Sequence, residues 1–138
     1  MYRLSSVTVP SAARAAAEER ARRVEVEFLE AVRVRLPAHP AVVESLGCLY
    51  TEMGRYQDGL RADRDMVRME PDSPNAWYNL ACSLSLTGQP DDAFAALGKA
   101  IALGYDDAEW MQDDEDFEPI KQDPRFARLL AQLLARQA

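Results

Sequence analysis

The chain has 138 residues and a formal net charge of −7, and 48% of its residues are hydrophobic. This length suits one domain, and the apolar fraction is enough to bury a core. The negative charge argues against general binding to nucleic acids or anionic membranes, because both need a basic surface. No apolar run is long enough to span a membrane, and the first residues lack the core of a signal peptide, so we expect a cytoplasmic protein.

Turn-forming residues divide the chain into segments of about one helix each. In chain order the breaks fall at 37–40, 54–55, 71–74, 88–90, 104 and 123–124. Between the breaks apolar residues recur at helical spacing, and no useful length alternates with the period of a strand. Pro74, Pro90 and Pro124 stand at or near a first helical position, where the missing N–H costs nothing. The sequence therefore predicts an all-α protein. Among the basic residues only Lys99 and Lys121 are lysines, a compositional hint of a GC-rich bacterial genome.

The middle of the chain repeats itself at an interval of 34 residues. Seven pairs of identical residues share this spacing: Pro40 and Pro74, Leu46 and Leu80, Cys48 and Cys82, Gly54 and Gly88, Asp58 and Asp92, Ala62 and Ala96, Asp72 and Asp106. So many identities in one register indicate a repeated unit, with copies at 40–73 and 74–107.

A helix–turn–helix period of this length is the signature of the tetratricopeptide repeat, and the chain resembles that family. The matching residues are Leu46, Gly47, Tyr50, Gly54, Tyr56 and Pro71 in the first copy, and Trp77, Leu80, Ala81, Gly88, Ala93 and Ala100 in the second. The chain departs from the pattern at Gly59, at Asp63, where a large apolar residue is usual, and at Tyr105, which replaces a closing proline. The resemblance implies a right-handed superhelix of antiparallel helix pairs with capping helices at both ends. Within it Trp77 would be a core residue; a small helical bundle without true repeats is the alternative fold.

The flanks are expected to complete one domain over residues 11–138. A single hairpin cannot cover its apolar face, and about three units are needed for stability. Residues 11–37 are interpreted as one N-terminal helix or a degenerate repeat, with continuity favoured and a flexible N-terminus at 1–10. Residues 108–138 form a C-terminal capping segment, whose Asp-Pro-Arg-Phe element at 123–126 is similar to a tail that ends many bacterial tetratricopeptide proteins. Its last helix places on one face Phe126, Leu129, Leu130, Leu133 and Leu134.

No group of residues predicts an enzyme, a cofactor or a metal site. His39 is the sole histidine, and it lies in a turn with no partner placed beside it. Cys48 and Cys82 take the same place in successive units, too far apart for a disulfide, and are interpreted as half-buried apolar residues; a redox-sensitive groove is the alternative. The acidic run from Asp106 to Glu118 lacks the ligand spacing of a calcium loop. The run also carries residues that look like packing residues of the tail: Trp110, Met111 and Phe117.

The resemblance implies that a peptide or helix of a partner protein binds in a concave groove lined by the first helix of each unit. The candidate lining residues are Glu44, Ser45, Cys48 and Glu52 from the first unit, and Asn75, Tyr78, Asn79, Cys82 and Ser85 from the second. Glu44 stands where members of the family that grip a carboxylate carry lysine, so we expect a neutral or basic partner.

The sequence therefore predicts a non-enzymatic module that binds protein. Two alternatives stay open. The protein is a structural subunit that forms a homodimer, or docks onto a larger complex, through its terminal helices; or it is a chaperone for a secreted protein.

Overall fold

The computed structural model describes residues 10–137, and within that range it contains helices and no strands. The predicted all-α fold is therefore confirmed. In chain order the elements are α1 (Ser11–Arg35), α2 (Pro40–Glu52), α3 (Tyr56–Met69), α4 (Pro74–Leu86), α5 (Pro90–Ala102), α6 (Ala108–Asp113), the short 3₁₀ helix η1 (Glu115–Phe117) and α7 (Pro124–Gln137). The flexible N-terminus predicted at 1–10 lies, except for Pro10, outside the described residues.

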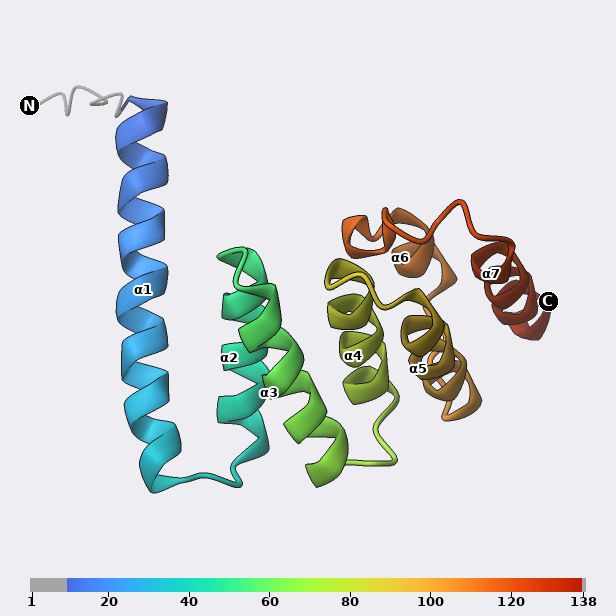
Figure 1. Cartoon of the computed structure of the whole chain (residues 1–138), viewed down its shortest axis with the longest axis horizontal. Coiled ribbons are helices and arrows are strands. Elements are labelled where there is room, and N and C mark those ends of the chain that lie inside the picture. The colour runs from blue at the N-terminus through green and yellow to red at the C-terminus, as the bar shows by residue number, and fades with distance from the viewer. Residues whose placement is uncertain (1–9, 138) are drawn as a thin grey trace, which may run out of the picture.

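The helices form a row of antiparallel pairs (Figure 1). Helices α2 and α3 make the first pair, α4 and α5 the second, and α3 packs against α4 to join them. Helix α1 stands at one end of the row as a single continuous helix, and α6 and α7 cover the other end. Among the described residues no helix combines the length and apolar character that crossing a bilayer requires.

The two pairs begin and end at equivalent residues, because the same local signals recur in each unit. Pro40 and Pro74 are the first residues of α2 and α4. Gly54 and Gly88 follow the first helix of each pair with φ of +74° and +73°, a conformation that residues with a Cβ rarely adopt. These prolines and glycines set the length of each helix and so the 34-residue period.

Buried apolar side chains form two clusters. One lies in the first pair and includes Leu46, Tyr50 and Met66, and α1 adds Val26 to it. The other lies between the second pair and the C-terminal elements, where Phe117 and Met111 are fully buried. The C-terminal segment is therefore part of the core of the second unit.

Trp77 is less buried than the resemblance implied. Its ring packs against the second cluster, but it is only partly buried, and its Nε1 donates a hydrogen bond to the carbonyl of Pro71 at 2.7 Å. We therefore expect Trp77→Ala to cost less than the roughly 3–5 kcal/mol of a fully buried tryptophan.

Asp63 is a carboxylate in the interface between the two pairs. It occupies the position that Leu97 holds in the next unit, it is buried, and the Ser83 hydroxyl donates a hydrogen bond to it at 2.5 Å. Burial raises the pKa of Asp63 from its usual 3.8 to about 6, and the bond from Ser83 opposes only part of that rise. The departure from the family pattern thus places a titratable group between the units.

We predict that Asp63→Asn removes a pH dependence of stability. Because the folded pKa of Asp63 is raised, the carboxyl group binds its proton more tightly in the folded protein. Its contribution to stability is largest below the usual pKa of 3.8 and is lost as the pH rises through about 6. The loss corresponds to about 3 kcal/mol. Urea unfolding of both proteins across this pH range measures it: the wild type should lose stability relative to Asp63→Asn, and parallel curves would contradict the prediction.

Candidate functional site

Two adjoining hollows lie on the face formed by α2, α4 and the segment around α6. Their volumes are about 470 and 550 Å³. Four residues line both of them: Cys48, Tyr78, Asn79 and Trp110. We call the two hollows together the groove.

One wall of the groove is an acidic segment, defined here as Asp106–Glu118, that folds back over α4. The Tyr78 hydroxyl donates to Asp114 at 2.7 Å, and the Ser85 hydroxyl donates to the backbone carbonyl of Asp116 at 2.7 Å. The Tyr78 ring stacks on Tyr105 with centroids 4.3 Å apart and meets the edge of Phe117 at 5.4 Å. Polar and aromatic contacts thus fix the segment against the second unit.

The nine candidate residues differ in how far they are exposed. Those of α2 are exposed, as is Asn75, while Asn79 is partly buried. The other three residues of α4, which are Tyr78, Cys82 and Ser85, are buried beneath the acidic segment. Ser45 and Ser85 lie outside the lining of the groove, and the other seven candidates contribute to it.

Trp110 is a groove residue that the sequence analysis interpreted as a packing residue. Its neighbour Met111 and also Phe117 are fully buried, as expected, but Trp110 is 62% exposed and lines both hollows. In the short helix α6 a residue next to a buried one points to a different side. The sequence did contain a signal for this difference. Trp110 and Met111 are adjacent, and one face of a helix can bury only one of two adjacent residues.

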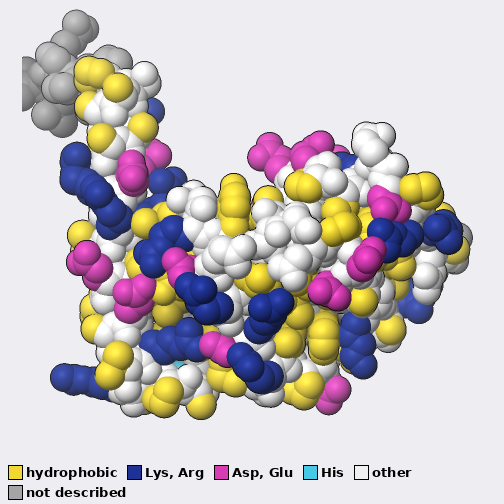
Figure 2. All heavy atoms as spheres, viewed as in Figure 1, with side chains coloured by type: hydrophobic (Ala, Val, Ile, Leu, Met, Phe, Trp, Pro, Cys, Tyr) yellow, Lys and Arg dark blue, Asp and Glu magenta, His cyan; other side chains and the backbone are white. Residues whose placement is uncertain are grey.

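The charge of the groove is acidic. Its lining includes Glu44, Glu52, Asp63, Asp106, Asp107, Asp114, Glu115 and Asp116. Among the residues that line the two hollows there is no lysine, arginine or histidine. Figure 2 shows acidic side chains together at the edge near α6, whereas arginine side chains gather over α3. Glu52 is also in reach of Arg22 on α1, at 3.5 Å.

Both cysteines of the groove are held in the thiol form. Burial raises the pKa of Cys48, and the nearby carboxylates of Asp63, Glu44 and Glu52 raise it further. Burial also raises the pKa of Cys82, well above its usual range, and Asp114 adds to the effect. Because the thiolate is the form that attacks electrophiles and binds metals, these cysteines are weak in both roles at neutral pH.

Cys82, Asp114 and Asp116 bring one potential ligand atom each to within 4.8 Å of one another. Two of these groups are already hydrogen-bonded to each other. The Cys82 thiol donates to Asp114 Oδ2 at 3.7 Å, and the same oxygen accepts the hydrogen bond from Tyr78. Burial and the Asp114 charge raise the pKa of Asp116 as well. The cluster therefore acts as a hydrogen-bonded support for the acidic segment.

Comparison with known proteins places the fold. Residues 65–95, from α3 into α5, match a family model described as tetratricopeptide repeat. The solved structure "MamA MSR-1 C2" is similar to this chain with a TM-score of 0.63, over 86% of this chain and 70% of that one, at 21% identity. Residues 65–95 therefore match a tetratricopeptide repeat, and the chain as a whole shares the fold of that solved structure.

A curated relative matches a shorter region. This relative, a chloroplastic protein of Arabidopsis thaliana, is 28% identical over 89 residues, which is 62% of this chain and 27% of the relative. This chain thus spans about a quarter of that relative's length.

We predict that the acidic segment shields Cys82 from alkylation. In the native protein Cys48 should react with iodoacetamide because it is exposed, but slowly because its pKa is raised. Cys82 is buried and should stay unmodified. Phe117→Ala removes the ring that packs on Tyr78, so it should speed modification of Cys82 and leave Cys48 little changed. Mass spectrometry of tryptic peptides measures both rates. Equal rates for the two cysteines in the native wild type would contradict this account.

Proposed function

We propose that this protein is an interaction module that binds a basic segment of a partner protein in the groove. The observation that carries the proposal is the charge of the lining, which is acidic on both walls and without a basic side chain among the lining residues. Such a surface attracts lysine and arginine and repels acidic chains.

The two walls offer different contacts. Glu44 lies on α2 and lines one of the two hollows, and Glu115 lies on the acidic segment and lines the other. Both are exposed, and among the described residues no ion pair involves either of them. An extended basic segment between the walls would therefore meet carboxylates on either side.

Two further residues suit a peptide ligand. The exposed ring of Trp110 offers a face to an arginine or lysine side chain, an interaction that strengthens as water is excluded. Asn79, between the walls on α4, offers an amide that both donates to and accepts from a peptide backbone. Charge, an aromatic face and an amide together suit a peptide ligand better than a small apolar molecule.

The comparisons support the proposal at a coarser level. The tetratricopeptide-repeat match favours a role in binding proteins, and the structural likeness supports the same helix-pair scaffold. The expectation that the ligand is basic rests on the acidic lining of the groove, and not on the comparisons. The proposed role is non-enzymatic, and the raised pKa values of Cys48 and Cys82 are consistent with it.

Selection from a random peptide library on the immobilised protein tests the proposal. We expect the recovered peptides to be enriched in arginine and lysine, and their binding to weaken with salt. Trp77→Phe leaves Trp110 as the only tryptophan, because the chain has two, so its fluorescence should report the titration.

The groove variant is Glu44→Arg with Glu115→Arg, which we expect to weaken a selected basic peptide by about tenfold or more. Asp92→Arg is the matched control. It makes the charge change of one groove substitution, at an exposed residue that lines a separate hollow beside Trp77, and is compared with Glu44→Arg alone and Glu115→Arg alone as well as with the double variant. Enrichment of acidic peptides, or equal weakening by the groove and control variants, would overturn the proposal.

A further inference from the structure

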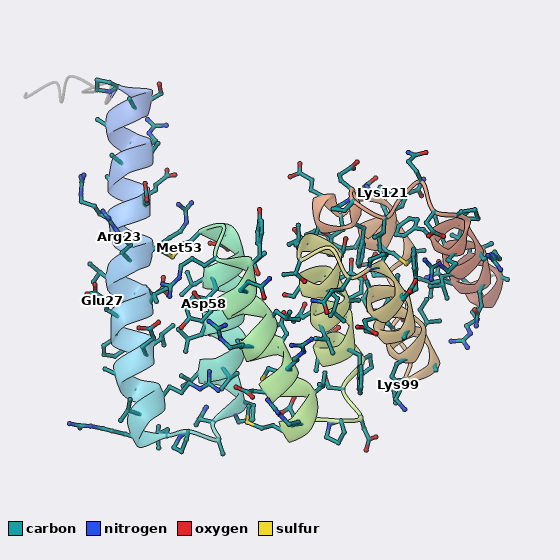
Figure 3. All side chains as sticks on the ribbon, in the orientation of Figure 1. Arg23, Glu27, Met53, Asp58, Lys99 and Lys121 are labelled. Atoms are coloured by element: carbon teal, nitrogen blue, oxygen red, sulfur yellow. The ribbon has the colours of Figure 1, made fainter. Side chains whose placement is uncertain are left out.

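Helix α3 carries three aspartates, and one of them lacks a basic partner. Asp58 and Asp65 each form ion pairs with two arginines. Figure 3 shows Asp58 on the side of α3 that is nearer to α1. Asp63 is the most deeply buried of the three, yet no ion pair within residues 10–137 involves it. Buried charges in proteins are normally paired, so a cation from outside the chain would complete the surroundings of Asp63.

One oxygen of Asp63 is free to accept a hydrogen bond. Oδ2 accepts from Ser83, and Oδ1 accepts from no described residue. Asp63 is 6% exposed and lines the hollow of about 470 Å³, which we call the first hollow. Among the described residues the sole side-chain polar atom that is both sealed from solvent and unpartnered is the Tyr105 hydroxyl. Asp63 Oδ1 therefore reaches the space of the first hollow.

This floor exists because the first unit differs from the second at two facing positions. Gly47 stands where the second unit has Ala81, and Asp63 stands where it has Leu97. A Cβ on residue 47 would lie 2.8 Å from Asp63 Oδ1, closer than side-chain carbons approach an oxygen in proteins. Ala81 and Leu97 are both completely buried, so the same place in the second unit is apolar and closed.

The lining of the first hollow runs from exposed to buried residues. Trp110 is 62% and Tyr56 is 39% exposed, and Glu115 is exposed as well. Asp63 and Ser83 are buried. A ligand group that meets Asp63 must therefore pass two aromatic rings, which suits a long side chain with an apolar stem and a cationic end.

The polar groups around the floor suit a guanidinium. Asp116 of η1 also lines the first hollow, and its charge helps to raise the pKa of Asp63. A guanidinium carries its N–H donors in one plane, can meet acceptors from two elements at once, and is less strongly hydrated than an ammonium group. A calcium ion takes about six to eight oxygen ligands. Both oxygens of Asp114 already accept hydrogen bonds, which leaves fewer oxygens free than such an ion needs.

We propose that the first hollow binds an arginine side chain of the basic segment, with the guanidinium donating a hydrogen bond to Asp63 Oδ1. This inference rests on the proposed function, because the arginine belongs to the segment that the groove would bind. Asp63 is then the residue that makes the groove prefer arginine to lysine, whereas the exposed carboxylates attract both.

Calorimetric titration with hexa-arginine and hexalysine at equal ionic strength tests the preference. The two peptides carry the same charge, and the wild type should bind hexa-arginine about tenfold more tightly. Asp63→Asn should bring hexa-arginine down to the affinity of hexalysine. Asp92→Asn, the same change at an exposed aspartate outside the groove, should keep the preference. Circular dichroism checks that both variants are folded.

Gly47→Ala separates contact from charge. The added methyl group would displace or cover Asp63 Oδ1 and leaves the charge of the groove unchanged. It should therefore abolish the preference for hexa-arginine and leave hexalysine binding as in the wild type. A preference that survives in Gly47→Ala or in Asp63→Asn would overturn the proposal.

The pH dependence of binding is a second readout. The affinity for hexa-arginine should fall as the pH drops through about 6, because Asp63 then takes up a proton. Asp116 and Glu44 also act on Asp63, while Cys48 and Cys82 have raised pKa values and stay protonated in this range. Asp63→Asn should flatten the profile. An equal fall in both proteins would contradict the assignment.

The same titrations separate this inference from the proposed function. Equal binding of the two peptides by the wild type, weakened by Glu44→Arg with Glu115→Arg, would leave the acidic groove standing and refute the arginine site. Absence of binding by either peptide would overturn both.

Discussion

The contact between Tyr78 and the acidic segment is the interaction on which the shape of the groove depends. The ring of Tyr78 meets Phe117 and also stacks on Tyr105, the residue just before the segment, and its hydroxyl donates to Asp114. Burial raises the pKa of Tyr78 far above its usual range, so the hydroxyl remains a donor at any physiological pH. Without this contact α4 would present an open face, and the second wall of the groove would be absent.

This contact also accounts for the electrostatics. Folding the acidic segment onto α4 crowds Asp114 and Asp116 toward Cys82 and Asp63, and the resulting repulsion and desolvation appear as raised pKa values in three of these groups. Burial of Phe117, Met111 and Ile120 offsets that cost. The groove therefore holds a concentration of negative charge because apolar packing, and not ion pairing, keeps the segment in place. A basic partner would relieve the repulsion, which links the stability of the segment to binding.

The sequence was informative where the signals are local. The period of 34 residues, the prolines at Pro40 and Pro74 and the glycines at Gly54 and Gly88 predicted the helix pairs, because each acts on the backbone of its own turn. The repeat also placed Cys48 and Cys82 in equivalent positions. Their different exposure was not predictable, since Cys82 is covered by Asp114, which lies 32 residues away in the chain, and the same position in the first unit has no such cover.

Two other features needed the structure for the same reason. Asp63 departs from the pattern of the repeat, but its carboxylate accepts a hydrogen bond from Ser83 of the next unit, a pairing that no pattern within one repeat reveals. Neither tryptophan is as buried as expected. Trp110 lines the groove, and Trp77 lies at the edge of the core. In each case a long-range contact, rather than local periodicity, decides how much of the side chain is exposed.

Amide hydrogen exchange of the wild-type protein tests most directly whether the acidic segment is docked on α4. The amides of Met111, Phe117 and Ile120 donate hydrogen bonds to backbone carbonyls within the segment, those of Asp107, Asp114 and Phe117. If the segment is docked through Tyr78, these amides should exchange about as slowly as those in the middle of α4, because both open only when the second unit unfolds. Exchange at the rate of an unstructured peptide, while α4 stays protected, would show that the wall of the groove is not part of the folded core and would contradict the account.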